Sequence, residues 1–297
     1  MKTSSEHPLI SVLLPTYNGA DTLESCLEAI MAQDYPNFEV VITDDDSHDR
    51  SAEISARYAS RYPNIRLHVN KQRLGLYPNV CFAASLAKGP YVHFAEQDDL
   101  YEPSFLSRLA ELMQANPDAG AVSCTHVVKR TDGTHCYDMY YAHNFKNSLA
   151  RAYNMLIDIG EEGTYGEIFV TGLVKKDLFL EAMGGLGNNF HSQIYTTHYA
   201  LAGPLPCIPE PLKTKFKTPG GQVRHRSIKV LKARWYYPFV VSYAVMRAAI
   251  RSPNVPLATK IGTPLPLMLY TVTHLLRLTK LKINGGRVRN RAVLTDG

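Results

Sequence analysis

The chain has 297 residues, of which 45% are hydrophobic and 20% charged, and these values exclude a generally disordered protein. The length provides for one full α/β domain with an appendage. The five cysteines are scattered and lack any C-x-x-C pair, which argues against a zinc site or a disulfide framework. The polar start has no apolar signal-peptide segment, so we expect the protein to remain in the cytoplasm.

The formal net charge of +5 hides an uneven distribution. Residues 222–297 contain 14 lysines and arginines and a single acid, Asp296, whereas the rest of the chain has 18 basic and 26 acidic residues. We therefore expect a mildly acidic catalytic body, residues 1–220, and a strongly basic helical tail, residues 221–297.

In the first half of the chain, apolar runs rich in β-branched residues alternate with amphipathic helical patterns. Strands are predicted at Ile10–Leu14, Phe38–Thr43, Ile65–Val69, Tyr91–Ala95 and Ala121–Val128. Helices are predicted at Asp21–Gln33, Asp49–Tyr62, Pro78–Lys88 and Pro103–Asn116. This β-α-β series indicates an α/β fold with a mostly parallel sheet, right-handed crossovers and helices on both faces.

The loops after the first, second and fourth strands are polar, and in such a sheet they should meet at one edge. They read Pro15-Thr16-Tyr17-Asn18-Gly19, Asp44-Asp45-Asp46-Ser47 and Glu96-Gln97-Asp98-Asp99. The adjacent acids Asp98 and Asp99 favour a hard divalent cation at this edge. The alternative is that they only cap the helix that Pro103 begins.

After about Gly133 the pattern becomes less regular. We predict a strand at Glu167–Val174, a short helix at Lys176–Met183 and a longer helix at Asn188–Ala202. A proline-marked exit follows at Pro204–Pro211. This stretch is expected to finish the sheet and to build the wall that faces a second substrate.

The basic tail contains two apolar runs, Trp235–Met246 and Ile261–Leu278. Neither offers the roughly 20 uninterrupted apolar residues that a membrane-spanning helix needs. Interfacial helices on an anionic membrane surface fit better, because cations flank both runs. The alternative is that the helices pack on the catalytic body. A nucleic-acid partner is disfavoured, since no known binding module accompanies the cations.

Three motifs in this order and spacing resemble the family 2 glycosyltransferases of GT-A fold. The matching residues are Ser11–Asn18, Val41–Asp49 and Gln97-Asp98-Asp99 with Pro103, together with Asn70, Gly75 and Asn79. The resemblance covers residues 9–128 well and residues 167–211 loosely. It implies a Rossmann-like GT-A sheet with a donor half, residues 9–130, and an acceptor half, residues 131–220.

The resemblance also implies a nucleotide-sugar site. In it Pro15, Thr16 and Tyr17 line the base pocket and Asp45 reads the base edge. The implied donor-binding residues are Pro15, Thr16, Tyr17, Asn18, Asp44, Asp45, Asn79 and Asp98. Asp99 would ligate Mg²⁺ or Mn²⁺, with Gln97 standing where the family's aspartate-x-aspartate motif has its first acid. Asp44 has an alternative role as a turn residue.

The resemblance implies that the sugar is transferred with inversion of configuration at the anomeric carbon. In such a reaction a base must deprotonate the acceptor hydroxyl. Family members place an acid at the helix start, but residues 187–194 contain no carboxylate. His191 is one candidate base, because imidazole titrates near neutral pH; it is also compatible with a purely structural role. Glu167 is the second candidate, with an edge-strand carboxylate as the alternative.

We therefore expect a metal-dependent glycosyltransferase at the inner face of the membrane. It would move a sugar from a UDP- or dTDP-sugar to a hydroxyl of a glycan or lipid-linked acceptor in cell-surface polysaccharide synthesis. A non-catalytic nucleotide-sugar binding or scaffold protein of the same fold is the alternative. A nucleotidyltransferase is disfavoured, because Pro15–Asp21 lacks the glycine-rich loop and basic residue that such enzymes have there.

Overall fold

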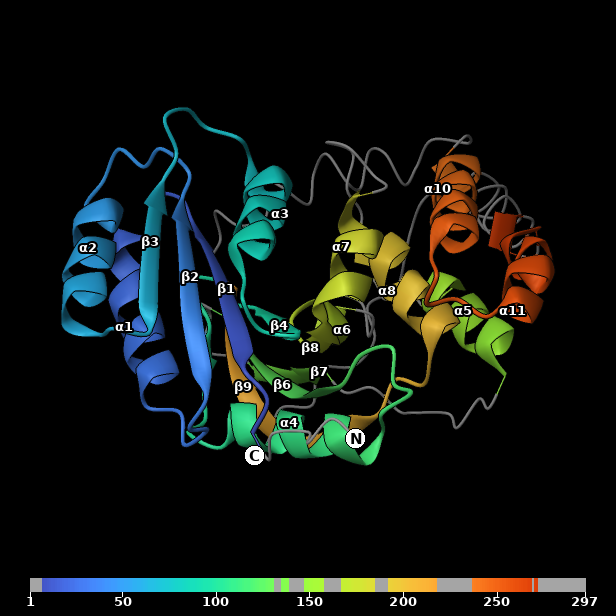
Figure 1. Cartoon of the computed structure of the whole chain (residues 1–297), viewed down its shortest axis with the longest axis horizontal. Helices are drawn as coiled ribbons and strands as arrows, with labels where there is room; N and C mark the ends of the chain where they lie inside the picture. Colours follow the sequence, from blue (N-terminus) through green and yellow to red (C-terminus); the bar gives the residue numbers. More distant parts are fainter. Residues whose placement is uncertain are drawn as a thin grey trace.

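The computed structural model describes residues 7–130, 135–138, 147–157, 167–184, 192–217, 237–268 and 270–271. Within these residues two β-sheets are flanked by helices (Figure 1). The larger sheet lies on one side of the molecule, and the C-terminal helices lie at the opposite end (Figure 1).

The larger sheet has the strand order β3-β2-β1-β4-β8. Strands β1 (Ile10–Thr16), β2 (Phe38–Asp44), β3 (Ile65–Val69) and β4 (Tyr91–Phe94) run parallel. The edge strand β8 (Leu173–Lys175) pairs antiparallel with β4. The predicted α/β fold with a mostly parallel sheet is therefore confirmed.

The larger sheet is apolar on both faces, because successive side chains of a strand point to opposite sides. On β1, Leu13 belongs to one buried cluster, whereas Val12 and Leu14 belong to the other. Four helices cover the two faces, with α1 and α2 on one side and α3 and α7 on the other (Figure 1). Their bounds are α1 Ala20–Met31, α2 Ser51–Arg61, α3 Leu76–Leu86 and α7 Lys176–Gly184.

A second sheet, of order β5-β9-β6-β7, lies under the first. Its strands are β5 Leu100–Tyr101, β6 Ser123–Arg130, β7 His135–Asp138 and β9 Cys207–Lys217, and helix α4 (Phe105–Ala115) packs against β9. The strand predicted at Ala121–Val128 is therefore present as β6, in this sheet.

The proline-marked exit predicted at Pro204–Pro211 is wrong, because β9 runs through most of it and pairs with β6. The pairing jumps from Cys124↔Ile208 to Thr125↔Pro211. This register shift places Pro209 outside the ladder, where its missing amide costs no hydrogen bond.

The strand predicted at Glu167–Val174 is wrong in its first half. Glu167–Val170 forms the short helix α6, and only the end of the run enters β8. Between them Gly172 lies so close to the backbone of Val122 that an added Cβ would collide with it. A short buried apolar run fits a helix or a strand equally well, so its period could not decide between them.

The C-terminal helices pack on the body of the protein. Helix α10 lies against α8, and α11 lies against α5 and α10. Their bounds are α5 Ser148–Ile157, α8 Ser192–Ala202, α10 Tyr237–Arg251 and α11 Leu257–Gly262. Val245, Ala249 and Leu267 share one apolar cluster with residues of α3 and α7. In the described part of the chain, no helix combines the length and the apolar character that crossing a membrane requires.

A carboxylate on α7 connects this end to the body. Glu181 accepts hydrogen bonds from the Ser252 hydroxyl and from the Asn254 side chain, both in the segment that follows α10. The buried His198 of α8 lies 3.7 Å from the same carboxylate. Helices α7, α8 and α10 are therefore joined at one point.

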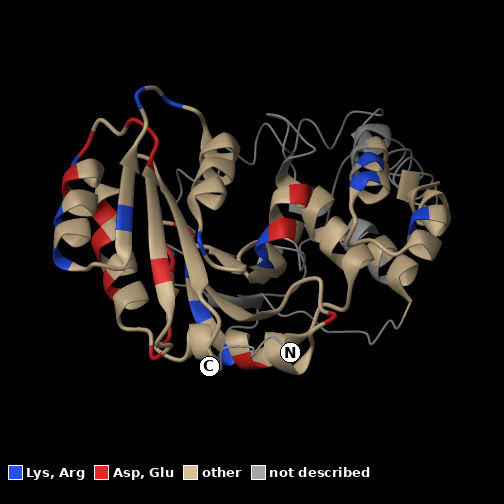
Figure 2. Ribbon diagram, viewed as in Figure 1, with Lys and Arg blue, Asp and Glu red and all other residues tan. Residues whose placement is uncertain are grey.

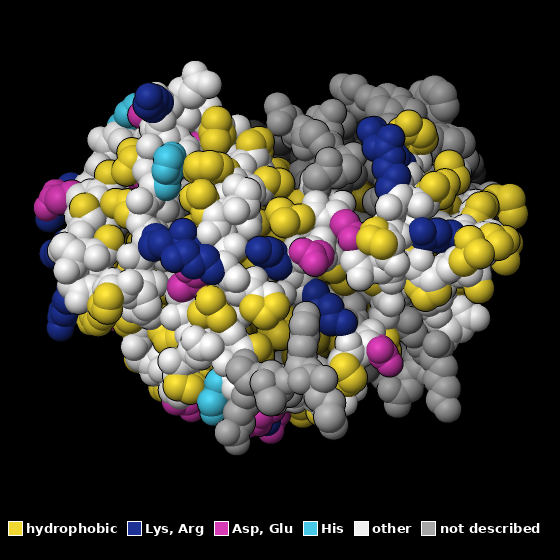
Figure 3. Space-filling view, viewed as in Figure 1, with side chains coloured by type: hydrophobic (Ala, Val, Ile, Leu, Met, Phe, Trp, Pro, Cys, Tyr) yellow, Lys and Arg dark blue, Asp and Glu magenta, His cyan; other side chains and the backbone are white. Residues whose placement is uncertain are grey.

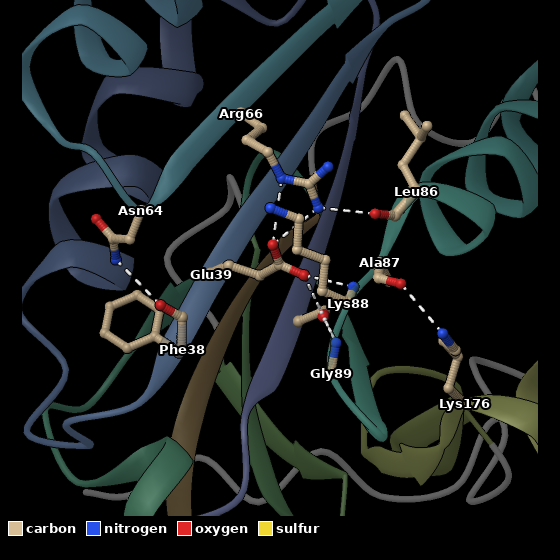
Figure 4. A network of polar contacts seen from close by, with 10 residues as sticks. Phe38, Glu39, Asn64, Arg66, Leu86, Ala87, Lys88, Gly89 and Lys176 are labelled. Atoms are coloured by element: carbon tan, nitrogen blue, oxygen red, sulfur yellow. Dashed lines mark hydrogen bonds and ion pairs between the residues drawn. The ribbon is translucent and has the colours of Figure 1, made fainter.

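The amino-terminal end of the larger sheet is braced by the buried Glu39 of β2 (Figure 4). Its carboxylate accepts hydrogen bonds from Ser11 at 2.7 Å and from the Lys88 amide at 2.6 Å. Arg66 of β3 forms an ion pair with the other oxygen at 2.8 Å and also donates to the Leu86 carbonyl. Burial alone would raise the pKa of Glu39, but these donors lower it below its ordinary value.

Candidate active site

A cleft opens at the carboxyl ends of β1, β2 and β4, the edge where open α/β sheets bind ligands. Acidic residues occupy the loop after β2, and basic residues the loop between β3 and α3 (Figure 2). The residues lining the cleft are Pro15, Thr16, Tyr17, Asp45, Arg73, Leu76, Asn79, Phe94, Glu96, Gln97 and Asp98. The three polar loops singled out in the sequence therefore meet, as predicted.

Asp45 is held at one wall of the cleft by three donors. One carboxylate oxygen accepts hydrogen bonds from the Asn70 side chain and the Leu74 amide, at 3.0 and 2.7 Å. The other accepts one from the Gly75 amide at 2.8 Å. Gly75 has φ = 89°, a conformation that favours glycine. Because a carboxylate oxygen can accept two hydrogen bonds, the second oxygen retains one acceptor position.

Asn79 supports the same wall from α3. Its side chain donates to the Thr43 carbonyl at 2.7 Å and accepts from Asn70 at 2.9 Å. Asn70 therefore lies between Asp45 and Asn79, and the wall is a continuous network of neutral and charged hydrogen bonds. Such a network fixes the positions of its members before any ligand arrives.

Tyr17 lies between two partners in the cleft. The Arg73 guanidinium lies 3.9 Å from the centre of its ring. On its backbone, the amide donates to Gln97 at 2.9 Å and the carbonyl accepts from the same side chain at 3.1 Å. A Cβ at Gly19 would collide with Gln97, so the loop after β1 closes tightly over the loop after β4.

Glu96 and Asp98 place two carboxylates on the floor of the cleft. Glu96 forms an ion pair with Lys215 of β9 at 2.6 Å. Although burial opposes the change, Lys215 and Lys213 lower the pKa of Glu96 to about 2. Burial, and then the negative charge of Glu96, raise the pKa of Asp98. Asp98 is thus a carboxylate whose ionised form lacks full compensation from the protein.

Asp99 does not face the cleft. Its side chain is 1% exposed and is ion-paired with the buried Lys213 of β9, directly behind the cleft floor. Burial raises the pKa of Asp99, and Lys213 opposes that increase. The geometry therefore does not support the metal-ligand role that we expected for Asp99, because its carboxylate is committed to a lysine of the second sheet. The preceding residue, Asp98, lines the cleft instead.

Asn18 and Asp44 are also outside the cleft lining, although both were expected to bind the donor. Asn18, which has φ = 45°, accepts a hydrogen bond from the His48 amide on its side chain and donates one from its own amide to the Ser47 hydroxyl. Asp44 accepts hydrogen bonds from the amide and the hydroxyl of Ser47. Both side chains shape the turns beside the cleft, which corrects the expected role for Asn18 and agrees with the turn alternative for Asp44.

The two candidate bases are not placed by the structure. His191 lies outside the described residues, and so does the side chain of Glu167, whose backbone begins α6. Their predicted roles therefore remain predictions.

Three contributors to the site were missed in the sequence. Glu96 stands two residues before Asp98, and this acid-x-acid spacing was a readable signal that the interpretation of Gln97 as a replaced acid obscured. Lys213 and Lys215 gave no such signal, because their place under the cleft depends on the pairing of β9 with distant strands. In the described part of the chain no three histidine, cysteine or acidic residues form a metal-holding group.

The family model for glycosyl transferase family 2 matches residues 11–165, more than half of the chain. The chain belongs to glycosyl transferase family 2. The chain is 26% identical over 202 residues to glycosyltransferase GlyG of Streptococcus pneumoniae, covering 66% of this chain and 67% of GlyG. It is 37% identical over 125 residues to the uncharacterized protein MT1568 of Mycobacterium tuberculosis. That match covers 42% of this chain and only 38% of the MT1568 protein.

Solved structures confirm the GT-A fold. TarS of S. aureus, in complex with UDP-GlcNAc, superposes with a TM-score of 0.56 at 14% identity, over 94% of this chain and 93% of that chain. The mannosyltransferase PcManGT of Pyrobaculum calidifontis, in complex with GDP-Man and Mn²⁺, gives a TM-score of 0.53 at 20% identity, over 95% and 89% of the two chains. At these identities the likeness establishes the fold alone.

Proposed function

We propose that this glycosyltransferase transfers a sugar from a UDP- or dTDP-sugar to a hydroxyl of a glycan or lipid-linked acceptor, with inversion at the anomeric carbon. The observation that carries the proposal is the cleft itself, in which the fixed Asp45 wall faces a floor with the open carboxylate Asp98. On the wall, Asp45 can accept a hydrogen bond from a nucleotide base. On the floor, Asp98 can provide an oxygen ligand for a cation that also binds the diphosphate.

Asp45 supports a pyrimidine base in the donor. Its remaining acceptor position can take the ring N–H of uracil or thymine, which a carboxylate binds better than a neutral acceptor does. The ring of Tyr17 offers an apolar face to the same base, and Arg73 provides a positive charge beside it. These residues would bind and orient the nucleotide without taking part in bond breaking.

Asp98 fits a divalent cation, Mg²⁺ or Mn²⁺, whereas the neighbouring Glu96 is already paired with Lys215. A single carboxylate leaves most of an octahedral shell to diphosphate oxygens and water, which is how such ions are usually held beside nucleotides. A nearby cation would also offset the burial and the repulsion from Glu96 that together raise the pKa of Asp98. When bound, the ion would stabilise the negative charge of the departing nucleoside diphosphate. The Mn²⁺ in the PcManGT complex is consistent with this part of the proposal.

The remaining chemistry is a proton transfer from the acceptor hydroxyl to a base as the hydroxyl attacks the anomeric carbon. We retain His191 and Glu167 as the candidates for that base, and one of the two must come within hydrogen-bond reach of the acceptor. The cellular role that we propose is cell-surface polysaccharide synthesis at the cytoplasmic face of the membrane.

A thermal-shift panel tests the donor. UDP-GlcNAc, UDP-glucose, dTDP-glucose and GDP-mannose are each added with and without Mn²⁺. A UDP- or dTDP-sugar should raise the melting temperature only when Mn²⁺ is present, since a ligand bound by the native state alone stabilises it. Stabilisation by GDP-mannose alone, or by none of the four donors, would contradict the proposed donor class.

The alternative of a non-catalytic donor-binding protein is tested by turnover. Donor hydrolysis or transfer that is lost in His191→Ala or Glu167→Ala, while the thermal shift with donor persists, supports the enzyme. Donor binding with no hydrolysis or transfer in the unaltered protein would instead favour the scaffold.

A further inference from the structure

Large apolar side chains are exposed along one face of α11 and the helical turn that follows it. Leu257, Ile261, Leu265 and Met268 have 72%, 74%, 56% and 59% of their surfaces exposed. They are spaced four, four and three residues apart, which places them on one helical stripe. A stripe of four such residues is unusual for a surface that meets only water, because single exposed hydrophobics are the norm.

The opposite face of the same segment accounts for its packing. Thr259, Thr263 and Leu267 are buried, and the Thr259 side chain is hydrogen-bonded to Ser148 of α5. The exposed stripe is therefore not a core face that has lost its partner. The segment already has an inner side against the body and an outer side that is apolar.

Helix α10 continues this surface with a mixed face. Tyr243 and Ile250 are 61% and 59% exposed and lie on the same side as the exposed Arg247 and Arg251, away from the buried Val245 and Ala249. Figure 3 shows hydrophobic atoms at this end of the molecule beside dark blue lysine and arginine. The surface composed of these α10 residues, Lys260 and the α11 stripe is named the terminal face below.

The charge of the terminal face has one sign. Lysine and arginine are coloured on α10 and α11, and acidic colour appears on neighbouring α7 but not on these two helices (Figure 2). The sequence agrees, because residues 222–295 contain no aspartate or glutamate. Apolar side chains surrounded by cations alone match an anionic lipid surface, in which acyl chains accept the former and phosphates the latter.

We propose that the terminal face docks this glycosyltransferase on the surface of an anionic bilayer. Leu257, Ile261, Leu265 and Met268 enter the headgroup region, and Arg247, Arg251 and Lys260 contact lipid phosphates. A second protein would have to supply matching acidic groups around an apolar groove, whereas anionic lipid supplies both everywhere. The inference rests on the membrane location given under the proposed function, but it does not depend on the donor or on catalysis.

Vesicle co-sedimentation of the full chain tests the proposal without any nucleotide. The vesicles contain either phosphatidylcholine alone or phosphatidylcholine with phosphatidylglycerol at about three to one. Binding should be strong only with the anionic lipid and should weaken as salt is raised. The triple variant Leu257→Ser, Ile261→Ser, Leu265→Ser should lower the partition coefficient by about tenfold or more.

Two further variants make the result specific. Val69→Ser with Phe216→Ser removes exposed apolar side chains elsewhere and should bind like the unaltered protein. Arg247→Gln with Arg251→Gln should reduce binding and flatten its salt dependence. Circular dichroism melting checks that each variant is folded.

Equal binding by the stripe variant, or no binding to anionic vesicles by the unaltered protein, would overturn the proposal. So would a dimer in vesicle-free buffer that the stripe variant converts to a monomer, because a second copy would then cover the face. The nucleotide-sugar panel is run without lipid, and the vesicle experiment is run without nucleotide. A negative result in one of them therefore does not change the interpretation of the other.

Discussion

The two ends of the larger sheet both contain carboxylates, one buried and one half-buried, but they use them in opposite ways. At the amino-terminal end, Glu39 is surrounded by donors from three other segments, and its pKa is lowered. At the carboxyl end, Asp98 lines an open cleft beside Glu96, and its pKa is raised. A carboxylate with all of its partners inside the protein is a brace, whereas one that lacks them is available to a ligand.

The floor of the cleft combines both conditions in neighbouring residues. Asp99 is buried behind the cleft and ion-paired with Lys213, whereas Asp98 lines the cleft. Adjacent positions in the sequence therefore differ in role because one side chain meets a lysine from β9 and the other does not. Distinguishing the two kinds of carboxylate by experiment requires that stability and activity be measured on the same variants.

The largest effect should come from Asp98→Asn. We expect transfer or donor hydrolysis to fall by about 100-fold or more, because charge stabilisation at the departing diphosphate is lost. The free energy of unfolding at pH 7 should not decrease, since the native state no longer holds an under-compensated charge. The measurements are initial rates and urea unfolding curves.

Asp46→Asn is the matched control. It lies outside the cleft lining and has φ = 62°, which asparagine tolerates. A rate for Asp98→Asn close to that of this control would remove Asp98 from the mechanism.

The next effect concerns Lys213, whose removal should destabilise the protein without a ligand being involved. Lys213→Met leaves Asp99 buried without its cation, and we expect a loss of about 3 kcal/mol in the free energy of unfolding. Adding Asp99→Leu should recover most of the loss, because neither charge then remains.

Lys215→Met provides the comparison for Lys213. Lys215 is paired with the more exposed Glu96, so its removal should cost less. If Lys213→Met unfolded at the same urea concentration as the unaltered protein, the buried pair would have no part in holding the two sheets together.

The smallest effect, about 1–2 kcal/mol, is expected for Glu39→Gln, which weakens the brace at the far end of the sheet. Because the folded-state pKa of Glu39 is lowered, its stabilisation is present above the unfolded pKa and is lost as pH falls through the folded value. The difference in unfolding free energy between the two proteins should therefore shrink from pH 7 to pH 3.

Activity of Glu39→Gln should stay unchanged at a temperature where both proteins are folded. A loss of activity without a loss of stability would mean that the amino-terminal end of the sheet influences the cleft. Glu39 would then have more than a structural role.

The part of the fold that the sequence predicted well is the part built from neighbours in the chain. Strands β1–β4 and helices α1–α4 follow from apolar periods and polar breaks, and their carboxyl-end loops must meet once the strands are parallel. The position of Asp45 and Asp98 at this edge was predicted in this way. Asp99 was assigned wrongly because its partner is more than a hundred residues away on β9. Nothing local in the run from Leu212 to Phe216 reveals which strand it joins.

Glu181 links the terminal face to the body of the protein. This one carboxylate fastens the segment after α10 to α7, and α7 packs on α3, the helix that carries Asn79. In the part of the chain that the structure describes, packed helices therefore connect the terminal face to the cleft along this route. If lipid holds the terminal face, the fold sets the height and tilt of the cleft above the bilayer. The cleft would then reach only hydroxyls presented at a certain distance from the membrane.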